Sequence, residues 1–172
     1  MADFKVRGPY PVRCDKRIAG RVVIKERFWE SHPELSSIED KCGVYVFAIK
    51  PPRTEIFTPC YVGQAKKNFT QEVFTNDKLL KYNLALADYK SGAPKLFFLI
   101  HPNTKKNIKQ IEELEDYLIM MGFAVNPNIQ NDKGAKLPEW AISGVVRGAA
   151  KKPSKTAKHL ARMFEIKSRK GV

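Results

Sequence analysis

A carboxylate on the apolar side of a predicted helix is the first feature of this sequence that could do chemistry. At about 100° per residue, the stretch 107–121 gathers its apolar side chains into one arc, formed by Ile108, Ile111, Leu114, Leu118 and Ile119. Glu115 falls inside that arc, whereas its acidic neighbours lie outside it or at its edge. A buried carboxylate is costly unless it is paired, protonated or bound to a metal. Glu115 is therefore a candidate metal ligand, and the alternative is a buried ion pair or an edge residue whose head reaches water.

Two tyrosines on neighbouring predicted strands form a second candidate. The run 43–49 is β-branched and aromatic, and 60–63 is a second short strand. The short connection between them favours an antiparallel pair, which can bring Tyr45 and Tyr61 close together. Gly63, two residues after Tyr61, allows a backbone or a ligand to approach closely. The alternative is a pair of ordinary core aromatics.

The remaining elements define the frame that would hold these residues. We predict an N-terminal extension over 1–41, with a β-hairpin around Ala19–Gly20 outside the core and a short helix and loop within 26–40. A mixed α+β core with a small, mostly antiparallel sheet flanked by helices should follow over 42–148. Its other predicted elements are a helix over 76–90 that begins after Thr75, a buried strand at 96–100 and a last strand at 140–147.

Charge is the strongest compositional signal. The chain has 31 Lys and Arg against 18 Asp and Glu, a net charge of +13. Such a surplus favours a polyanionic partner, nucleic acid above all, although an anionic membrane surface would also suit it. Eight basic residues against one glutamate fall in 151–172, and the tail over 149–172 has helical apolar spacing at Ala157, Leu160, Ala161 and Phe164.

Location and cysteine content point to an ordinary intracellular protein. No apolar run approaches the roughly 20 residues of a membrane helix, and the first residues do not resemble a secretory signal. We expect a cytoplasmic protein without a membrane partner. Cys14, Cys42 and Cys60 are odd in number and far apart, so neither a disulfide framework nor a structural zinc site is expected.

Taken in order, these residues resemble a known enzyme family. Gly43-Val44-Tyr45 and Tyr61-Val62-Gly63 are similar to the two motifs that name the GIY-YIG nucleases. Residues 64–67 resemble the polar stretch after the second motif, and Glu115 resembles the glutamate of the family's helix. Asn131 is similar to the family's terminal asparagine, with Asn126 and Asn128 as competing assignments.

The resemblance implies a metal-dependent endonuclease that hydrolyses DNA phosphodiesters. Glu115 would hold Mg²⁺ or Mn²⁺, hard cations suited to oxygen ligands. Tyr45 or Tyr61 would activate the attacking water, and a nearby cation would be needed to favour the phenolate. Asn131 would orient neighbouring groups or brace its loop.

One departure from the family concerns its arginine, which lies about ten residues beyond the tyrosine of the second motif. That position holds Gln71 and Glu72 here. If 67–77 is an insertion that delays the helix, Lys78 takes the arginine's role, and Tyr82, one turn later, matches a family His or Tyr. The alternative is a solvated lysine beside a packed aromatic. Lys cannot form the bidentate fork of Arg on a phosphate.

The predicted contacts with nucleic acid lie beside the second motif and towards the C-terminus. They are Gly63, Lys66, Lys67, Arg147, Lys151, Lys152, Lys155 and Lys158. The leading hypothesis is a DNA endonuclease. Its alternatives are a protein of the same fold that only binds nucleic acid and a basic interaction protein without a nucleic-acid role.

Overall fold

The computed structural model describes residues 2–17, 20–89, 91–102, 108–131 and 154–163. The chain divides into two compact units, residues 1–135 and 136–172. The candidate residues Tyr45, Tyr61 and Glu115 belong to the first unit. The predicted strand at 140–147 lies outside the described residues.

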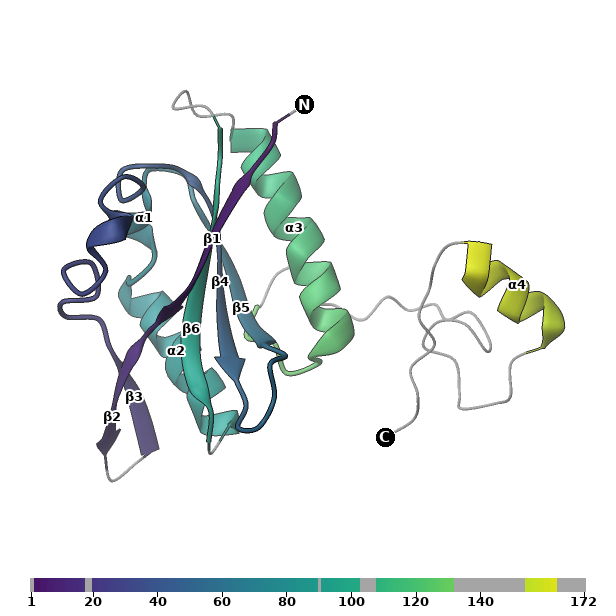
Figure 1. Ribbon diagram of the computed structural model, residues 1–172, viewed down its shortest axis with the longest axis horizontal. Helices are drawn as coiled ribbons and strands as arrows, with labels where there is room; N and C mark the ends of the chain where they lie inside the picture. Colours follow the sequence, from purple (N-terminus) through teal and green to yellow (C-terminus); the bar gives the residue numbers. More distant parts are fainter. Residues whose placement is uncertain (1, 18–19, 90, 103–107, 132–153, 164–172) are drawn as a thin grey trace. The chain divides into compact units, whose positions relative to one another are not determined.

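A four-stranded antiparallel sheet forms the centre of the first unit (Figure 1). Its strands, in spatial order, are β1 (Lys5–Pro11), β6 (Ala93–Ile100), β4 (Gly43–Lys50) and β5 (Thr58–Ala65). The predicted antiparallel pairing of the two motif strands is confirmed, with Tyr45 opposite Gly63 and Phe47 opposite Tyr61. Among the described residues β5 is an edge strand, with no strand paired to its outer side.

The N-terminal segment contributes both to this sheet and to a separate hairpin. β2 (Arg13–Arg17) and β3 (Gly20–Ile24) form the predicted hairpin as a second sheet. Residues 5–11, however, belong to the main sheet rather than to an extension outside the core, because β1 pairs with the free side of β6. Within 26–40 the only helical turn is the 3₁₀ helix η1 (Pro33–Leu35).

Helices cover the two faces of the sheet because side chains alternate along each strand. On one face, Tyr45, Phe47 and Phe98 pack into a core shared with α2 (Asn76–Asp88). On the other face, Val44 and Val62 pack with α3 (Ile108–Val125). The mixed α+β architecture predicted from the sequence is therefore confirmed.

The helices predicted over 76–90 and 107–121 and the buried strand are present. α2 follows the short helix α1 (Phe69–Glu72), and Thr75 is its N-cap residue, although its side chain makes no capping hydrogen bond. β6 alternates buried and half-buried residues. In the second unit, α4 (Lys155–Met163) lies within the predicted amphipathic tail, and the Ala157 amide donates to the Ser154 hydroxyl at 3.1 Å.

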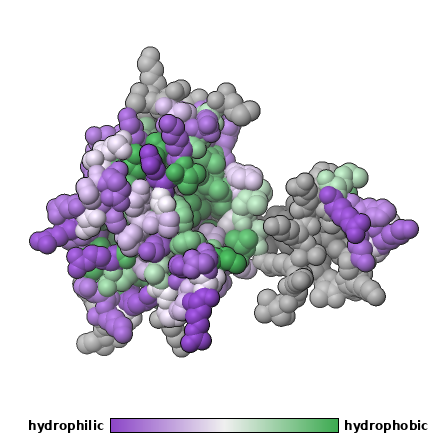
Figure 2. Space-filling model, in the orientation of Figure 1, coloured by the Kyte–Doolittle hydropathy of each residue, from purple (hydrophilic) through white to green (hydrophobic). Residues whose placement is uncertain are grey.

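Within the described part of the chain, no helix is long and apolar enough to span a membrane. Figure 2 shows hydrophilic side chains over much of the visible face of the first unit, around an apolar area in its upper centre.

Gly63 determines how the two motif strands pack. A Cβ atom at this position would overlap the Cζ and hydroxyl oxygen of Tyr45. Tyr45 is fully buried, so its ring cannot swing into solvent to make room. Gly63 therefore allows the Tyr45 ring to pack directly against the β5 backbone.

We expect Gly63→Ala to lower the free energy of unfolding by about 1–3 kcal/mol, the usual cost of overpacking a core. Urea denaturation of Gly63→Ala, Tyr45→Phe and the double variant measures this cost. The double variant should be less destabilised than the sum of the single variants, because the two residues touch. Gly122→Ala is the control, since the new methyl would meet the flexible end of Ile129 closely and Pro59 only at ordinary van der Waals distance. Unchanged stability in Gly63→Ala would contradict this account.

Candidate functional site

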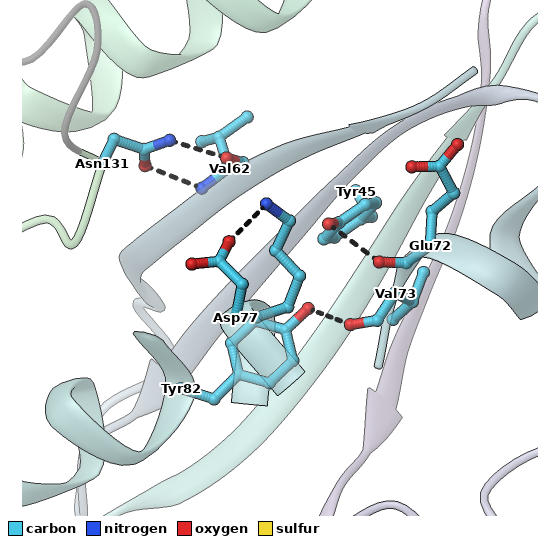
Figure 3. Close-up of polar contacts among 8 residues, drawn as sticks. Tyr45, Val62, Glu72, Val73, Asp77, Tyr82 and Asn131 are labelled. Atoms are coloured by element: carbon cyan, nitrogen blue, oxygen red, sulfur yellow. Dashed lines mark hydrogen bonds and ion pairs between the residues drawn. The ribbon is translucent and has the colours of Figure 1, made fainter. Parts of the chain in front are cut away.

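The two motif tyrosines lie side by side on one face of the sheet. Their ring centroids are 6.3 Å apart, which confirms the proximity expected from the strand pairing. Tyr45 has no exposed surface, and Tyr61 is 6% exposed. The Tyr45 hydroxyl donates to the Glu72 carbonyl at 3.4 Å (Figure 3). Of the two phenols, only that of Tyr61 retains access to solvent.

Tyr82 completes an aromatic cluster from α2. Its ring stacks on Phe47 with centroids 4.3 Å apart and meets Tyr61 edge-on at 5.9 Å. It is fully buried, and its hydroxyl donates to the Val73 carbonyl at 2.7 Å (Figure 3). In this arrangement Tyr82 supports Tyr61 and cannot reach a substrate. Tyr82 follows Lys78 by one turn of α2, but its hydroxyl is already engaged, and its match to a family His or Tyr stays a prediction.

Lys78 lies in the first turn of α2 and reaches the phenol of Tyr61. Its Nζ is 5.5 Å from the Tyr61 ring centroid and 2.9 Å from the Asp77 carboxylate. Partial burial lowers the pKa of Lys78, but hydrogen bonds to Asp77 and Tyr61 outweigh that effect and raise it above its ordinary value. The pKa shift therefore favours the charged form of Lys78 beside Tyr61, and its replacement of the family arginine stays a prediction.

Glu115 occupies the position that the helical wheel predicts. Ile111 and Ile119 are buried on the same side of α3, and Glu115 between them is half-buried. Burial raises the pKa of Glu115, and the neighbouring Asp116 adds to this effect. A hydrogen bond from the Gln64 backbone and the charges of Lys78 and Lys66 act in the opposite direction. Its carboxylate therefore lies beside the outer edge of β5, within the electrostatic influence of Lys78 and Lys66.

The same surroundings distinguish the two phenols. Burial raises the pKa of Tyr61 above its ordinary value, while the hydrogen bond and the charge of Lys78 lower it in part. Burial raises the pKa of Tyr45 much further, and Tyr82, Tyr61 and Glu115 add to the shift. Tyr45 has no lysine to oppose these effects. Tyr61 is therefore the phenol that an additional cation could ionise.

Asn131 connects the end of the described first unit to the edge of β5. Its side chain donates to the Val62 carbonyl at 2.7 Å and accepts from the Val62 amide at 2.9 Å (Figure 3). Asn126, a competing assignment, instead donates to the Pro59 carbonyl at 2.8 Å and accepts from the Asn128 amide. Both asparagines fix the loop to β5, and Asn131 binds next to Gln64, the backbone partner of Glu115.

Glu72, which stands where the family has its arginine, does not point towards the phenols. Its carboxylate accepts from the Lys67 amide at 3.1 Å. α1 and the turn that follows it separate β5 from α2, and the insertion suggested over 67–77 stays a prediction.

The predicted nucleic-acid contacts differ in their accessibility. Gly63 is buried against Tyr45, so a ligand cannot approach it, contrary to expectation. Lys66 forms an ion pair with Glu112 at 2.5 Å, and Lys67 is exposed. Lys155 and Lys158 are exposed on α4. Arg147, Lys151 and Lys152 lie outside the described residues.

Glu115 offers a carboxylate as an oxygen ligand for a divalent cation. Among the described residues, no three His, Cys, Asp or Glu side chains are grouped so as to hold a metal ion. Mg²⁺ commonly keeps several waters and binds through one or two carboxylates together with substrate phosphates. The residues present therefore fit a hydrated ion whose coordination a substrate completes, and they do not fit a closed protein cage.

Three interactions of this site were not anticipated from the sequence. They are the hydrogen bond from the Gln64 backbone to Glu115, the ion pair of Lys66 with Glu112, and the ion pair of Lys78 with Asp77. The last had a local signal, because the two residues are adjacent in the sequence. The first two depend on how α3 packs against β5.

Compared with protein-family models, curated proteins and solved structures, the chain gives no significant match to any of them. The relationship to the GIY-YIG nucleases therefore stays a prediction that rests on the residues themselves.

Replacing Lys78 by Met should raise the pKa of Tyr61 above its wild-type value, because the phenolate loses a hydrogen bond and a positive charge. The Cζ chemical shift of ¹³C-labelled tyrosine, followed by NMR as the pH increases, reports this pKa. Lys109→Met is the control, since Lys109 is exposed and pairs with Glu113. A Tyr61 pKa that stays constant or falls in Lys78→Met would show that the lysine does not act on this phenol.

Proposed function

We propose that this protein is a metal-dependent endonuclease that hydrolyses DNA phosphodiester bonds. The observation that carries the proposal is the convergence of Tyr61, Lys78 and Glu115 at the outer edge of β5. They come from β5, α2 and α3, and each alters the pKa of another. An acid, a base and a fixed cation at one partly exposed place are the groups that phosphodiester hydrolysis requires.

Tyr61 is the residue that we assign to activation of the attacking water. It has some exposure, and Lys78 favours its phenolate, whereas Tyr45 is completely buried and bonded to the Glu72 carbonyl. Tyr45 then acts as a positioning residue, since its ring fills the space above Gly63 and packs beside Tyr61.

Glu115 is the residue that would hold Mg²⁺ or Mn²⁺. When bound there, the ion would supply positive charge for the phosphate and the leaving oxygen. Lys66 and Lys78 place further positive charge near Glu115. Asn131 holds the adjacent part of β5 through both backbone groups of Val62.

Nucleic acid is the partner that the charge of the chain supports. The surplus of +13 favours binding to a polyanion. Lys67, Lys155 and Lys158 are exposed and available to phosphates. The resemblance to the GIY-YIG nucleases favours DNA over RNA.

A protein that binds nucleic acid without cutting it is the second candidate. It is favoured by the ion pair between Lys78 and Asp77, which ties up the lysine that would replace the family arginine. It is also compatible with the absence, among the described residues, of three metal-ligating side chains grouped together. Salt-sensitive DNA binding without cleavage under Mg²⁺ or Mn²⁺ would favour this candidate.

With plasmid DNA and Mg²⁺ or Mn²⁺, we expect the wild-type protein to nick or linearise the plasmid. Glu115→Ala should abolish cleavage and retain binding, and Tyr61→Phe should reduce the rate by about 10²–10⁴-fold, the usual contribution of a general base. Agarose-gel rates and fluorescence anisotropy measure the two properties separately.

Glu113→Ala is the matched control on the same helix, because Glu113 is exposed and makes only a surface ion pair with Lys109. It should cut at the wild-type rate. Full activity in Glu115→Ala would remove Glu115 from the proposed metal site.

A further inference from the structure

A second basic site lies at the far side of the same sheet. A cavity of about 290 Å³ opens there. It is lined by Lys5, Arg7, Ser37, Ile38, Lys41, Ile100, His101 and Pro102. The lining includes three basic side chains and a histidine but no carboxylate, together with an apolar wall.

The basic side chains of this cavity converge from separate parts of the chain. Lys5 and Arg7 lie two residues apart on β1 and so project from the same side of the strand. Lys41 comes from the segment before β4. In the part of the chain that the structure describes, none of the three forms an ion pair. Like charges brought together without acidic partners favour an anionic ligand.

The cavity is rigidly connected to the candidate centre through the sheet. One transverse row of paired residues crosses all four strands, from Lys5 through Ile100 and Gly43 to Ala65. Three strand spacings of about 4.8 Å make this row roughly 14 Å long. Lys66, whose positive charge acts to lower the pKa of Glu115, directly follows Ala65 in the sequence.

Exposed Lys67 lies between the two sites. Its carbonyl accepts from the Cys42 thiol at 3.8 Å, next to Lys41, and the Lys41 carbonyl accepts from the Phe69 amide at 3.1 Å. These contacts hold the segment that follows β5 against the segment that precedes β4. The backbone between the cavity and the candidate centre is therefore continuous through Lys67, whose side chain is exposed.

We propose that this cavity binds a backbone phosphate of the nucleic acid, at a distance from the phosphate presented to Glu115. The strand row between Lys5 and Ala65, roughly 14 Å wide, exceeds the ~3.4 Å rise per nucleotide of duplex DNA, so the cavity and the candidate centre face different phosphates. Lys5, Arg7 and Lys41 contact the phosphate, while Ile38 and Pro102 face the adjoining sugar. The inference shares with the proposed function only the identity of the partner, and it does not require cleavage.

The test is the salt dependence of duplex binding, measured in EDTA so that no cleavage occurs. Lys5→Ala/Arg7→Ala/Lys41→Ala should bind more weakly, and its log K against log salt slope should become shallower by at least about 0.9, one phosphate contact. The matched control is Arg13→Ala/Lys16→Ala/Lys25→Ala, which also removes one Arg and two Lys charges, but from exposed positions on or beside the β2–β3 hairpin. Equal slopes in the two triple variants would overturn the proposal.

A measurement on the unmodified protein covers the case in which the triple variant does not fold. Amide resonances of Ser37, Lys41 and His101 should shift when a short DNA duplex is added. Inorganic phosphate at matched ionic strength separates a free-anion site from a backbone site. Shifts with phosphate but not with DNA would overturn the proposal. If the salt slopes of the two triple variants differ but no divalent ion supports cleavage, the phosphate site is retained and the endonuclease is rejected. If the protein cleaves DNA and the two slopes are equal, the endonuclease is retained and the phosphate site is rejected.

Discussion

The candidate site depends on the outer edge of β5, whose backbone groups have no paired strand in the part of the chain that the structure describes. Unpaired backbone amides and carbonyls of a half-buried strand must find partners elsewhere. Gln130 and Asn131 supply them at Cys60 and Val62, and Glu115 supplies one at Gln64. The need to complete this edge therefore draws a carboxylate of α3 to the side of the sheet where Tyr61 lies.

Burial and charge oppose one another at this edge, and the balance differs for each residue. Burial favours the neutral forms of Glu115, Tyr61 and Tyr45 alike. Lys78 offsets this effect for Tyr61 and Glu115, while Tyr45 remains shielded above Gly63. Tyr61 and Glu115 are thus the two groups on which positive charge acts against burial. Tyr45 and Tyr82 are fully buried packing residues.

Local patterns predicted most of the elements that hold the site. The helical wheel placed Glu115 on the apolar side of α3, and strand alternation placed Tyr45 near Tyr61. The pairing of β1 with β6 was missed, because the choice of a strand partner depends on residues about 90 positions away. The sequence also did not show that the Tyr45 ring fills the space above Gly63. A glycine in a strand indicates that some group approaches closely, but it does not identify that group. The sequence spacing of Lys78 and Tyr82 could not show that Lys78 reaches Tyr61, whereas the Tyr82 hydroxyl donates to the Val73 carbonyl.

The central claim is that Glu115 holds a divalent cation beside Tyr61, and paramagnetic broadening by Mn²⁺ tests it most directly. The account predicts that substoichiometric Mn²⁺ broadens the Gln64 amide and Tyr61 ring resonances first. Glu115→Gln should abolish this broadening, and Glu113→Gln should leave it intact. Persistence of the broadening in Glu115→Gln, or its concentration around carboxylates away from β5, would contradict the account.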